Sequence, residues 1–272
     1  MLRGGNGMRK VLAIAGSDCS GGAGIQADLK TMTMHGVYGM SVITALTAQN
    51  TMGVTDVMLV SGAFLKKQLE AVFSDIVPDA IKIGMLGNKE IIEALADFFE
   101  EHSELIEKIP IVLDPVMVST SGHMLMEADA VEVLKKKLFP WSTLITPNLP
   151  ETNVLTEKKI ETLAQMKQAA AFLSEQYAIS VLVKGGHCSD SASDILYEKD
   201  KNCSTFSGEI LTNPNKHGSG CTLSSAIACN LAKGYTLQES CKKAKKYVEK
   251  AIGANLNLGR GRGPLNHMVE FR

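Results

Sequence analysis

The strongest constraint on the fold is an alternation of short apolar runs with segments of helical periodicity, which continues along the chain. The runs are apolar at consecutive positions and rich in β-branched residues, as in strands buried on both faces. Between them, apolar residues recur at a spacing near that of one side of a helix. The pattern predicts an α/β fold with a mainly parallel central sheet and helices on both faces. The predicted strands are 11–15, 41–46, 54–60, 80–83, 111–114, 143–146 and 181–184.

Capping residues mark where several of the predicted helices begin. Ser61 and Asn88 each precede a segment of helical spacing, and residues 236–239 form a capping box before the last helix. Two late runs, 194–197 and 204–211, predict an antiparallel hairpin. Because no linker or internal repeat interrupts the pattern, we expect a single domain over residues 8–272. Residues 1–7 would be an N-terminal extension that is disordered or carried over from cloning.

The charged residues are nearly balanced, with 28 Lys and Arg against 29 Asp and Glu and a formal net charge of -1. A chain without a basic stripe lacks the electrostatic footprint of proteins that bind nucleic acid or anionic membranes. No apolar run approaches the roughly 20 residues that cross a bilayer, and the start of the chain does not resemble a signal peptide. We therefore expect a cytoplasmic protein. Its six cysteines contain no Cys-x-x-Cys pair, which favours free thiols over disulfides or structural zinc.

In an open α/β sheet, ligands bind outside the carboxyl ends of the strands, so the segments that follow the strands are where a site is expected. The first of these segments contains Gly22 and Gly24 in a turn similar to a dinucleotide-binding loop. The acidic residue that would hold a ribose is absent from 44–55, which argues against NAD. Two interpretations remain: a tight turn, or a loop whose amides face a small polar substrate together with Asp28.

The segment 217–222 predicts the start of an anion-binding helix, whereas a P-loop motif is absent. Gly218 and Gly220 let several backbone N–H groups point in one direction, and the helix dipole adds positive potential. With Ser219, they would form a hole for the charge of a transferring phosphoryl group. We expect the helix start to lower the pKa of the Cys221 thiol and to favour its thiolate. The alternative is a glycine-rich helix entry with a buried cysteine.

Three charged residues at the ends of the later strands predict a phosphate and metal site. Asp114 ends one buried strand, Glu151 follows the next, and Lys184 ends the one after. An acid pair can hold Mg²⁺ through water, while a lysine contacts phosphate oxygens. Each residue alone is equally consistent with a helix cap or a salt bridge.

Two further segments predict contacts with a flat ring. The carboxamides of Gln49 and Asn50 follow an apolar strand and can offer both a donor and an acceptor to a heteroaromatic ring. Met85 could pack on such a ring. The alternative is that Met85, one of thirteen methionines, is an ordinary core residue. The small-residue segment 116–124 is either a mobile lid or a surface loop.

Taken together and in order, these motifs resemble the hydroxymethylpyrimidine/phosphomethylpyrimidine kinases of thiamine biosynthesis, in the ribokinase-like superfamily. The resemblance covers about residues 11–251, and a series of motifs is far more specific than any one of them. It implies a ribokinase-like three-layer α/β/α fold and the ATP-dependent phosphorylation of 4-amino-5-hydroxymethyl-2-methylpyrimidine and then of its monophosphate. The motifs are AGSD at 15–18, SGGAGIQADLK at 20–30, TAQNT at 47–51, KIGML at 82–86, LDPVM at 113–117, ITPNLPE at 145–151, KGGH at 184–187 and HGSGCT at 217–222.

The same resemblance implies roles for particular residues. Gln49 would pair with the aminopyrimidine, with Ala23, Asp28 and Met85 around it. Residues 218–221 would form the anion hole, in which Cys221 takes the place of the aspartate base of most ribokinase-like kinases. Asp114 and Glu151 would organise Mg²⁺ and phosphates, and Lys184 would contact ATP. Relatives in this family also suggest a homodimer.

The nearest alternative is a pyridoxal kinase of the same branch. Its bacterial forms place a second cysteine in the lid, where this chain has Ser119, and Gln49 with Asn50 retains the pyrimidine-kinase pattern. Both features favour the pyrimidine, with pyridoxal-type alcohols as side substrates. Cys19 stands where Pro or Ser is expected, and its effect on substrate choice stays open. A third possibility, from another functional class, is a non-catalytic sensor of a thiamine precursor.

Overall fold

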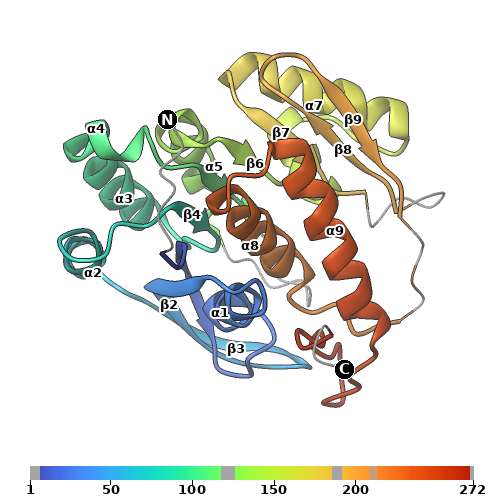
Figure 1. Cartoon of the computed structure of the whole chain (residues 1–272), viewed down its shortest axis with the longest axis horizontal. Coiled ribbons are helices and arrows are strands. Elements are labelled where there is room, and N and C mark those ends of the chain that lie inside the picture. The colour runs from blue at the N-terminus through green and yellow to red at the C-terminus, as the bar shows by residue number, and fades with distance from the viewer. Residues whose placement is uncertain (1–6, 118–125, 186–191, 209–210, 212, 270–272) are drawn as a thin grey trace.

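The computed structural model describes residues 7–117, 126–185, 192–208, 211 and 213–269. They build one nine-stranded sheet in the order β3-β2-β1-β4-β5-β6-β7-β8-β9 (Figure 1). The strands are β1 (Lys10–Asp18), β2 (Tyr38–Asn50), β3 (Gly53–Leu59), β4 (Ala80–Ile83), β5 (Ile111–Leu113), β6 (Leu144–Ile145), β7 (Ser180–Val183), β8 (Asp194–Tyr197) and β9 (Cys203–Phe206).

The six strands in the middle of the sheet are parallel, and both edges are antiparallel. β1 pairs in parallel with β2 and β4, and the parallel pairing continues through β5 and β6 to β7. β3 runs antiparallel to β2 at one edge, and β8 and β9 form the predicted late hairpin at the other. The mainly parallel sheet is therefore confirmed, whereas the antiparallel pairing of β2 with β3 was not predicted.

Helices cover both faces of this sheet, which explains why the strand sequences are apolar throughout. The helices are α1 (Gly24–Met34), α2 (Gly62–Phe73), α3 (Lys89–Glu101), α4 (Ser103–Ile106), α5 (Ala128–Lys137), α6 (Leu149–Thr156), α7 (Leu163–Tyr177), α8 (Ser219–Ala232) and α9 (Leu237–Gly253), with a 3-10 turn η1 (Phe139–Trp141). Successive strand residues face opposite layers. Ile81 and Ile111 join the core under α2, α3, α5 and α7, while Ala80 and Val112 join the core under α1, α8 and α9.

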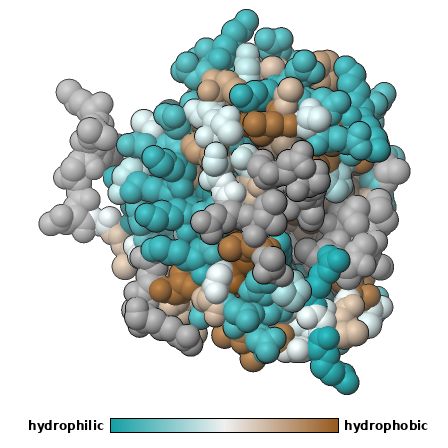
Figure 2. Space-filling model, turned by 90° about the vertical axis from the view of Figure 1, so that its right-hand side faces the viewer, coloured by the Kyte–Doolittle hydropathy of each residue, from teal (hydrophilic) through white to brown (hydrophobic). Residues whose placement is uncertain are grey.

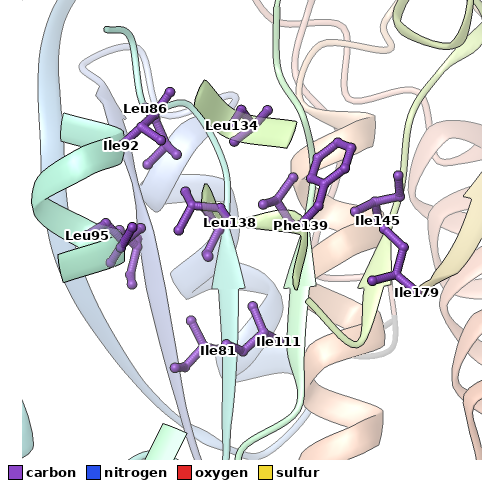
Figure 3. Packing of buried hydrophobic residues seen from close by; sticks show 14 of the residues in the cluster. Ile81, Leu86, Ile92, Leu95, Ile111, Leu134, Leu138, Phe139, Ile145 and Ile179 are labelled. Atoms are coloured by element: carbon purple, nitrogen blue, oxygen red, sulfur yellow. The ribbon is translucent and has the colours of Figure 1, made fainter. Parts of the chain in front are cut away.

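The first of these cores is the larger, and aliphatic side chains from three neighbouring strands form its floor. Figure 3 shows Ile81 beside Ile111, with Ile145 farther along the sheet and Leu95 of α3 and Leu134 of α5 in the same cluster. All five are at most 1% exposed. This packing holds β4, β5 and β6 rigidly, so that the residues following them have fixed positions.

The capping predictions are confirmed. The Ser61 side chain accepts from Phe64 N at the start of α2, and the Asn88 side chain accepts from Ile91 N at the start of α3. Thr236 and Glu239 form a reciprocal capping box on α9. Each cap satisfies backbone N–H groups that have no partner within the helix.

The surface around the α9 side of the molecule is mainly polar. Figure 2 shows hydrophilic residues over most of that face, with the described hydrophobic residues in small separate groups. In the described part of the chain, no helix has both the length and the apolar character that crossing a membrane requires.

Candidate active site

A cavity of about 610 Å³ opens at the carboxyl edge of the parallel strands, where ligands bind in open α/β sheets. Isolated bridges extend the sheet there: Ser17 pairs with Gly24, and Asn148 pairs with Lys184. All the predicted site residues except Asp28 and Asn50 line this cavity, and the exposed Asn50 side chain instead accepts from Met52 N in the turn after β2. Those that line it are Ala23, Gln49, Met85, Asp114, Glu151, Lys184, Gly218, Ser219, Gly220 and Cys221.

Two glycine-rich turns meet at the centre of the cavity. Gly218, with φ of 83°, is the N-cap of α8, and a Cβ on it would lie 1.9 Å from the carbonyl oxygen of Gly22. Gly24, with φ of 56°, begins α1, and a Cβ there would lie 2.3 Å from the carbonyl oxygen of Gly16. Only glycine permits these backbone approaches. The N-termini of α1 and α8 are thereby brought to the same cavity, where both contribute positive potential.

The turn after β1 is organised by Asp18, a residue that the sequence analysis did not select. Its carboxylate accepts hydrogen bonds from the backbone N–H groups of Ser20 (2.8 Å), Gly22 (3.1 Å) and Ala23 (2.9 Å). Burial alone would raise the pKa of Asp18, but hydrogen bonds from His217, from the side chain and backbone of Ser20 and from the Ala23 backbone outweigh it and lower the pKa to about 2. Asp18 is therefore an ionised residue that shapes the glycine turn.

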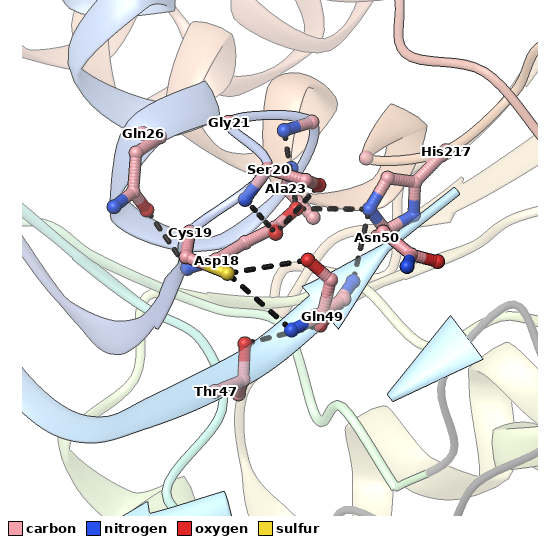
Figure 4. A network of polar contacts seen from close by, with 12 residues as sticks. Asp18, Cys19, Ser20, Gly21, Ala23, Gln26, Thr47, Gln49, Asn50 and His217 are labelled. Atoms are coloured by element: carbon pink, nitrogen blue, oxygen red, sulfur yellow. Dashed lines mark hydrogen bonds and ion pairs between the residues drawn. The ribbon is translucent and has the colours of Figure 1, made fainter. Parts of the chain in front are cut away.

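Figure 4 shows that His217 joins this turn to the end of β2. Its Nε2 lies 3.0 Å from Asp18 Oδ2 and 3.0 Å from Gln49 Nε2. From the sequence, His217 is only the first residue of the motif at 217–222, with no predicted role. His217 could have been predicted as a site residue, because a polar residue directly before the glycines of an anion-binding turn lies in the site with them.

The expected low pKa of Cys221 is wrong. Loss of solvent around the thiol raises the pKa to about 11, although the charge of Lys82 and a hydrogen bond with the Gly24 backbone act to lower it. The carboxylates of Asp28 and Asp114 raise it further. The helix start was the only effect considered from the sequence, and desolvation outweighs it. Cys221 is a neutral thiol at pH 7.

Asp28 does not face the cavity, contrary to our expectation. Its side chain is fully buried and lies 2.9 and 2.8 Å from Lys82 Nζ through its two carboxylate oxygens. It also accepts from Ser225 Oγ at 2.7 Å. Burial lowers the pKa of Lys82, but the charge of Asp28 more than offsets this and holds the pKa above its ordinary value. The apolar and polar positions of α1 could not reveal this pair, because Lys82 comes from a strand 54 residues away.

The three charged residues at the later strand ends lie together. Lys184 Nζ is 2.6 Å from Asp114 Oδ1, which also accepts from Thr146 Oγ1 at 3.1 Å. Gly220 is close to both charges, since a Cβ on it would lie 3.1 Å from Asp114 Oδ2 and 3.4 Å from Lys184 Nζ. The cationic lysine and the amides at the start of α8 therefore face the same small volume.

Glu151 is both a helix cap and a member of the charged group at the strand ends, the two interpretations that its sequence position left open. It is the third residue of α6 and forms a capping box with Asn148, so it is a helix cap. It also lies in the electrostatic range of Asp114: burial and the Asp114 charge raise the pKa of Glu151 to about 7, and Lys184 opposes them. An added cation would relieve this repulsion. Although no group of three or more metal-ligating residues occurs in the described ranges, two carboxylates suffice for Mg²⁺, which retains several waters.

Part of the cavity lining is apolar and was not anticipated. Leu211, Pro214, Val248 and Ile252 line it, and the Lys245–Asp194 ion pair (2.8 Å) stands beside them. Such an apolar slot suits a flat ring at the end of a phosphate chain. The predicted lid lies largely outside the described residues, as do Ser119 within it and His187 of the motif at 184–187.

Comparison with known proteins identifies the family. Residues 18–266 match the family model described as phosphomethylpyrimidine kinase. The hydroxymethylpyrimidine/phosphomethylpyrimidine kinase of Haemophilus influenzae is 44% identical over 269 residues, which cover 97% of this chain and 98% of that protein. This chain belongs to the phosphomethylpyrimidine kinase family. The resemblance carried by the motifs is thereby confirmed.

Solved structures of this family and of pyridoxal kinases share the fold. The phosphomethylpyrimidine kinase of Clostridium difficile is 44% identical, with a TM-score of 0.78 over 90% of this chain and 99% of that chain. A pyridoxal kinase from Staphylococcus aureus in complex with AMP-PCP is 34% identical, with a TM-score of 0.88 over 98% of this chain and 96% of that chain. The predicted ribokinase-like α/β fold of this family member is therefore confirmed.

The buried Asp28–Lys82 pair should be important for stability. Removing one member leaves an uncompensated charge in the core, so Asp28→Asn is expected to lower the free energy of unfolding by about 3–5 kcal/mol. Lys82→Met should have a similar effect, and the double variant should lose less than the sum because neither charge remains. Urea denaturation measures all three. Lys66→Met, which removes an exposed ion pair with Glu101, is the control and should cause little change. An Asp28→Asn variant as stable as the wild type would contradict this assignment.

The raised pKa of Cys221 predicts slow alkylation at neutral pH. With a pKa of about 11, the rate with iodoacetamide should rise about tenfold per pH unit from pH 7 to 10, because only the thiolate reacts. The reaction is followed by peptide mass spectrometry in a Cys19→Ser, Cys203→Ser background, which removes the two exposed thiols found among the described residues. Circular dichroism at each pH checks that the fold persists. A rate that levels off near pH 7 would show a thiolate and restore the original expectation.

Proposed function

We propose that this protein is a cytoplasmic, ATP- and Mg²⁺-dependent kinase that phosphorylates 4-amino-5-hydroxymethyl-2-methylpyrimidine and its monophosphate. Membership of the phosphomethylpyrimidine kinase family supports the substrate class. The observation that carries the proposal is the convergence in one cavity of an anion-binding helix start, a lysine, carboxylates and a carboxamide. The five described cysteines are free, as in a reducing compartment. Residues 8–272 would act as one kinase domain, since a single sheet carries all of these groups.

The cavity offers separate places for the two substrates. Gln49, Ala23 and Met85 would surround the pyrimidine beside β2. The apolar slot near Val248 and Ile252 would take the base of ATP, which places the γ-phosphate between Lys184 and residues 218–221. A Staphylococcus aureus pyridoxal kinase with AMP-PCP bound, whose chain superposes on this one, supports ATP as the phosphate donor.

Transfer to the alcohol requires positioning and charge stabilisation more than strong base catalysis. In a loose phosphoryl-transfer transition state the alcohol loses its proton late, while charge builds on the phosphoryl oxygens. The amides of residues 218–221 and Lys184 would stabilise that charge. Cys221, as a neutral thiol, would act as a proton relay: its sulfur accepts the proton of the alcohol while its S–H proton passes to a phosphoryl oxygen. Asp114 and Glu151 would hold Mg²⁺ through water, and the ion would neutralise phosphate charge.

Pyridoxal kinase is the second candidate, because solved pyridoxal kinases superpose on this chain with TM-scores up to 0.88. Their sequence identity of 34% is below the 44% shared with the Haemophilus influenzae pyrimidine kinase. We therefore place the pyrimidine first and pyridoxal-type alcohols as side substrates.

A coupled assay for ADP release tests the function directly. The wild type is expected to turn over the pyrimidine alcohol with a higher kcat/KM than pyridoxal, and only with Mg²⁺ present. Cys221→Ala should lower kcat by about 100-fold or more if the thiol carries the proton. Cys221→Asp should restore part of the loss, since a carboxylate can accept the same proton. Ligand binding without ADP release would identify a non-catalytic sensor, and a preference for pyridoxal would favour the second candidate.

We also propose that two copies associate through the β2–β3 edge. Leu46 and Met58 are paired across these antiparallel strands and are 42% and 61% exposed, and Met52 in the connecting turn is 63% exposed. Exposed apolar side chains on an edge strand and on the strand and turn beside it form a surface that association would bury.

Sedimentation velocity tests the association. The wild type is expected at twice the chain mass of 29.2 kDa, and a Leu46→Glu, Met58→Glu variant at the chain mass, because two charges would be buried in the contact. Val154→Glu, an equally exposed apolar residue on α6, is the control and should leave the dimer intact. A wild type that stays monomeric at micromolar concentration would refute this proposal.

A further inference from the structure

A chain of polar groups connects Asp18 to the carboxamide of Gln49 and continues to the end of β1 (Figure 4). His217 Nε2 is 3.0 Å from Asp18 Oδ2 and 3.0 Å from Gln49 Nε2. On the other side, Gln49 Oε1 is 3.2 Å from Thr47 Oγ1, which lies 3.0 Å from the carbonyl oxygen of Ser17. The carboxamide is therefore held at both of its polar atoms.

The surroundings of Asp18 determine which ring nitrogen of His217 bears a hydrogen. The Asp18 carboxylate already accepts from three backbone N–H groups and from Ser20 Oγ at 2.7 Å. A carboxyl group surrounded by donors in this way is ionised and can only accept. His217 Nε2 must therefore bear a hydrogen, which it donates to Asp18. The low pKa of Asp18 agrees with this state.

The orientation of the Gln49 carboxamide then follows from hydrogen-bond accounting. A protonated His217 Nε2 cannot accept from an amide N–H, so Gln49 Nε2 next to it would place a donor against a donor. At the other end, the single proton of Thr47 can be given to the Ser17 carbonyl, which leaves Gln49 Oε1 as an acceptor facing an acceptor. A rotation of the carboxamide by a half turn exchanges its oxygen and nitrogen and removes both conflicts. The oxygen then faces the His217 Nε2–H, which it shares with Asp18, and the N–H group faces Thr47 Oγ1, which can accept.

We propose that Asp18 and His217 are positioning residues that fix the Gln49 carboxamide with its oxygen toward His217 and its nitrogen toward Thr47, and so determine which heterocycle the site accepts. Each of the two amide atoms keeps one further hydrogen-bonding position for the ligand. The ligand must then offer a donor to the oxygen and a neighbouring acceptor to the N–H, in that fixed order. This inference rests on the proposed function and specifies its substrate class.

A 4-aminopyrimidine meets this requirement, because its amino group is a donor and the adjacent ring nitrogen is an acceptor. In the corresponding 4-oxo compound the order is reversed: the ring carries the N–H and the exocyclic atom accepts. A carboxamide free to rotate would bind either compound, whereas a fixed one would reject the second. Fixing the amide therefore converts a permissive side chain into a selective one.

The test compares the dissociation constants of the 4-amino alcohol and its 4-oxo analogue, measured by calorimetry on the full-length protein. The wild type should bind the amino compound about 100-fold more tightly, since two hydrogen bonds are mispaired in the other complex. His217→Phe removes the N–H and should reduce this ratio to about tenfold or less. His217→Gln keeps an N–H donor facing Asp18 and should retain most of the ratio. A structural role for His217 alone would move both affinities together and leave the ratio unchanged.

Cys19→Ser is the matched control. The hydrogen bonds between Cys19 and Gln49 involve the Gln49 backbone N and O, at 3.3 and 3.2 Å, and not the carboxamide, so the replacement of Cys19 should not alter the ratio. A measurement on the wild type guards against a His217→Phe variant that does not fold: the ¹⁵N spectrum of the histidine rings should show a protonated Nε2 on His217. An unprotonated Nε2, or an unchanged ratio in folded His217→Phe, overturns the inference. ADP release is measured in parallel, so loss of the proposed kinase activity is distinguished from loss of selectivity.

Discussion

The site depends on the contact between two turns that lie almost 200 residues apart in the chain. The carbonyl of Gly22 stands where a side chain on Gly218 would be, and this approach brings the starts of α1 and α8 together. Every other feature of the cavity is arranged around it. Asp18 folds one turn by accepting its amides, His217 enters from the other, and Gly220 leaves room beside Asp114 and Lys184. A side chain at either glycine would separate the two helix starts, and with them the positive potential that an anion requires.

Beneath these turns, opposite charges are paired inside the protein. Asp28 and Lys82 neutralise one another in the core, and Ser225 joins them to α8 one turn below Cys221. Burying either charge without its partner would cost too much free energy. The pair therefore fixes the positions of α1, β4 and α8 relative to one another. The same low-polarity surroundings raise the pKa of Cys221. The nearly neutral net charge of the chain is consistent with a protein that meets phosphates with backbone amides, a lysine and a metal instead of a basic surface.

Much of the fold could be predicted because it follows from local pattern. Strands buried on both faces must be apolar at every position, and runs such as 80–83 and 181–184 showed this directly. The caps at Ser61, Asn88 and Thr236 are equally local, since a side chain reaches only the next turn of backbone. The antiparallel pairing of β2 with β3 was not predicted, because the sequences of the two strands are similar apolar runs that do not indicate strand direction. Their direction depends on a short turn at residues 51–52 and not on their side chains.

For the site, the sequence by itself determined which chemical groups would meet at one edge of the sheet. Residues that follow parallel strands converge there whatever the details, which is why Asp114, Glu151, Lys184 and the turn at 217–222 were found. Only the tertiary structure decided what each group does. Burial placed Asp28 against Lys82 and turned a candidate ligand contact into a core ion pair, and it made Cys221 a neutral thiol. Long-range contacts joined His217 to Asp18 and Gln49. The physical reason is that local pattern sets which side chains a strand or helix presents, whereas solvent exclusion and partner distance set their charge and orientation.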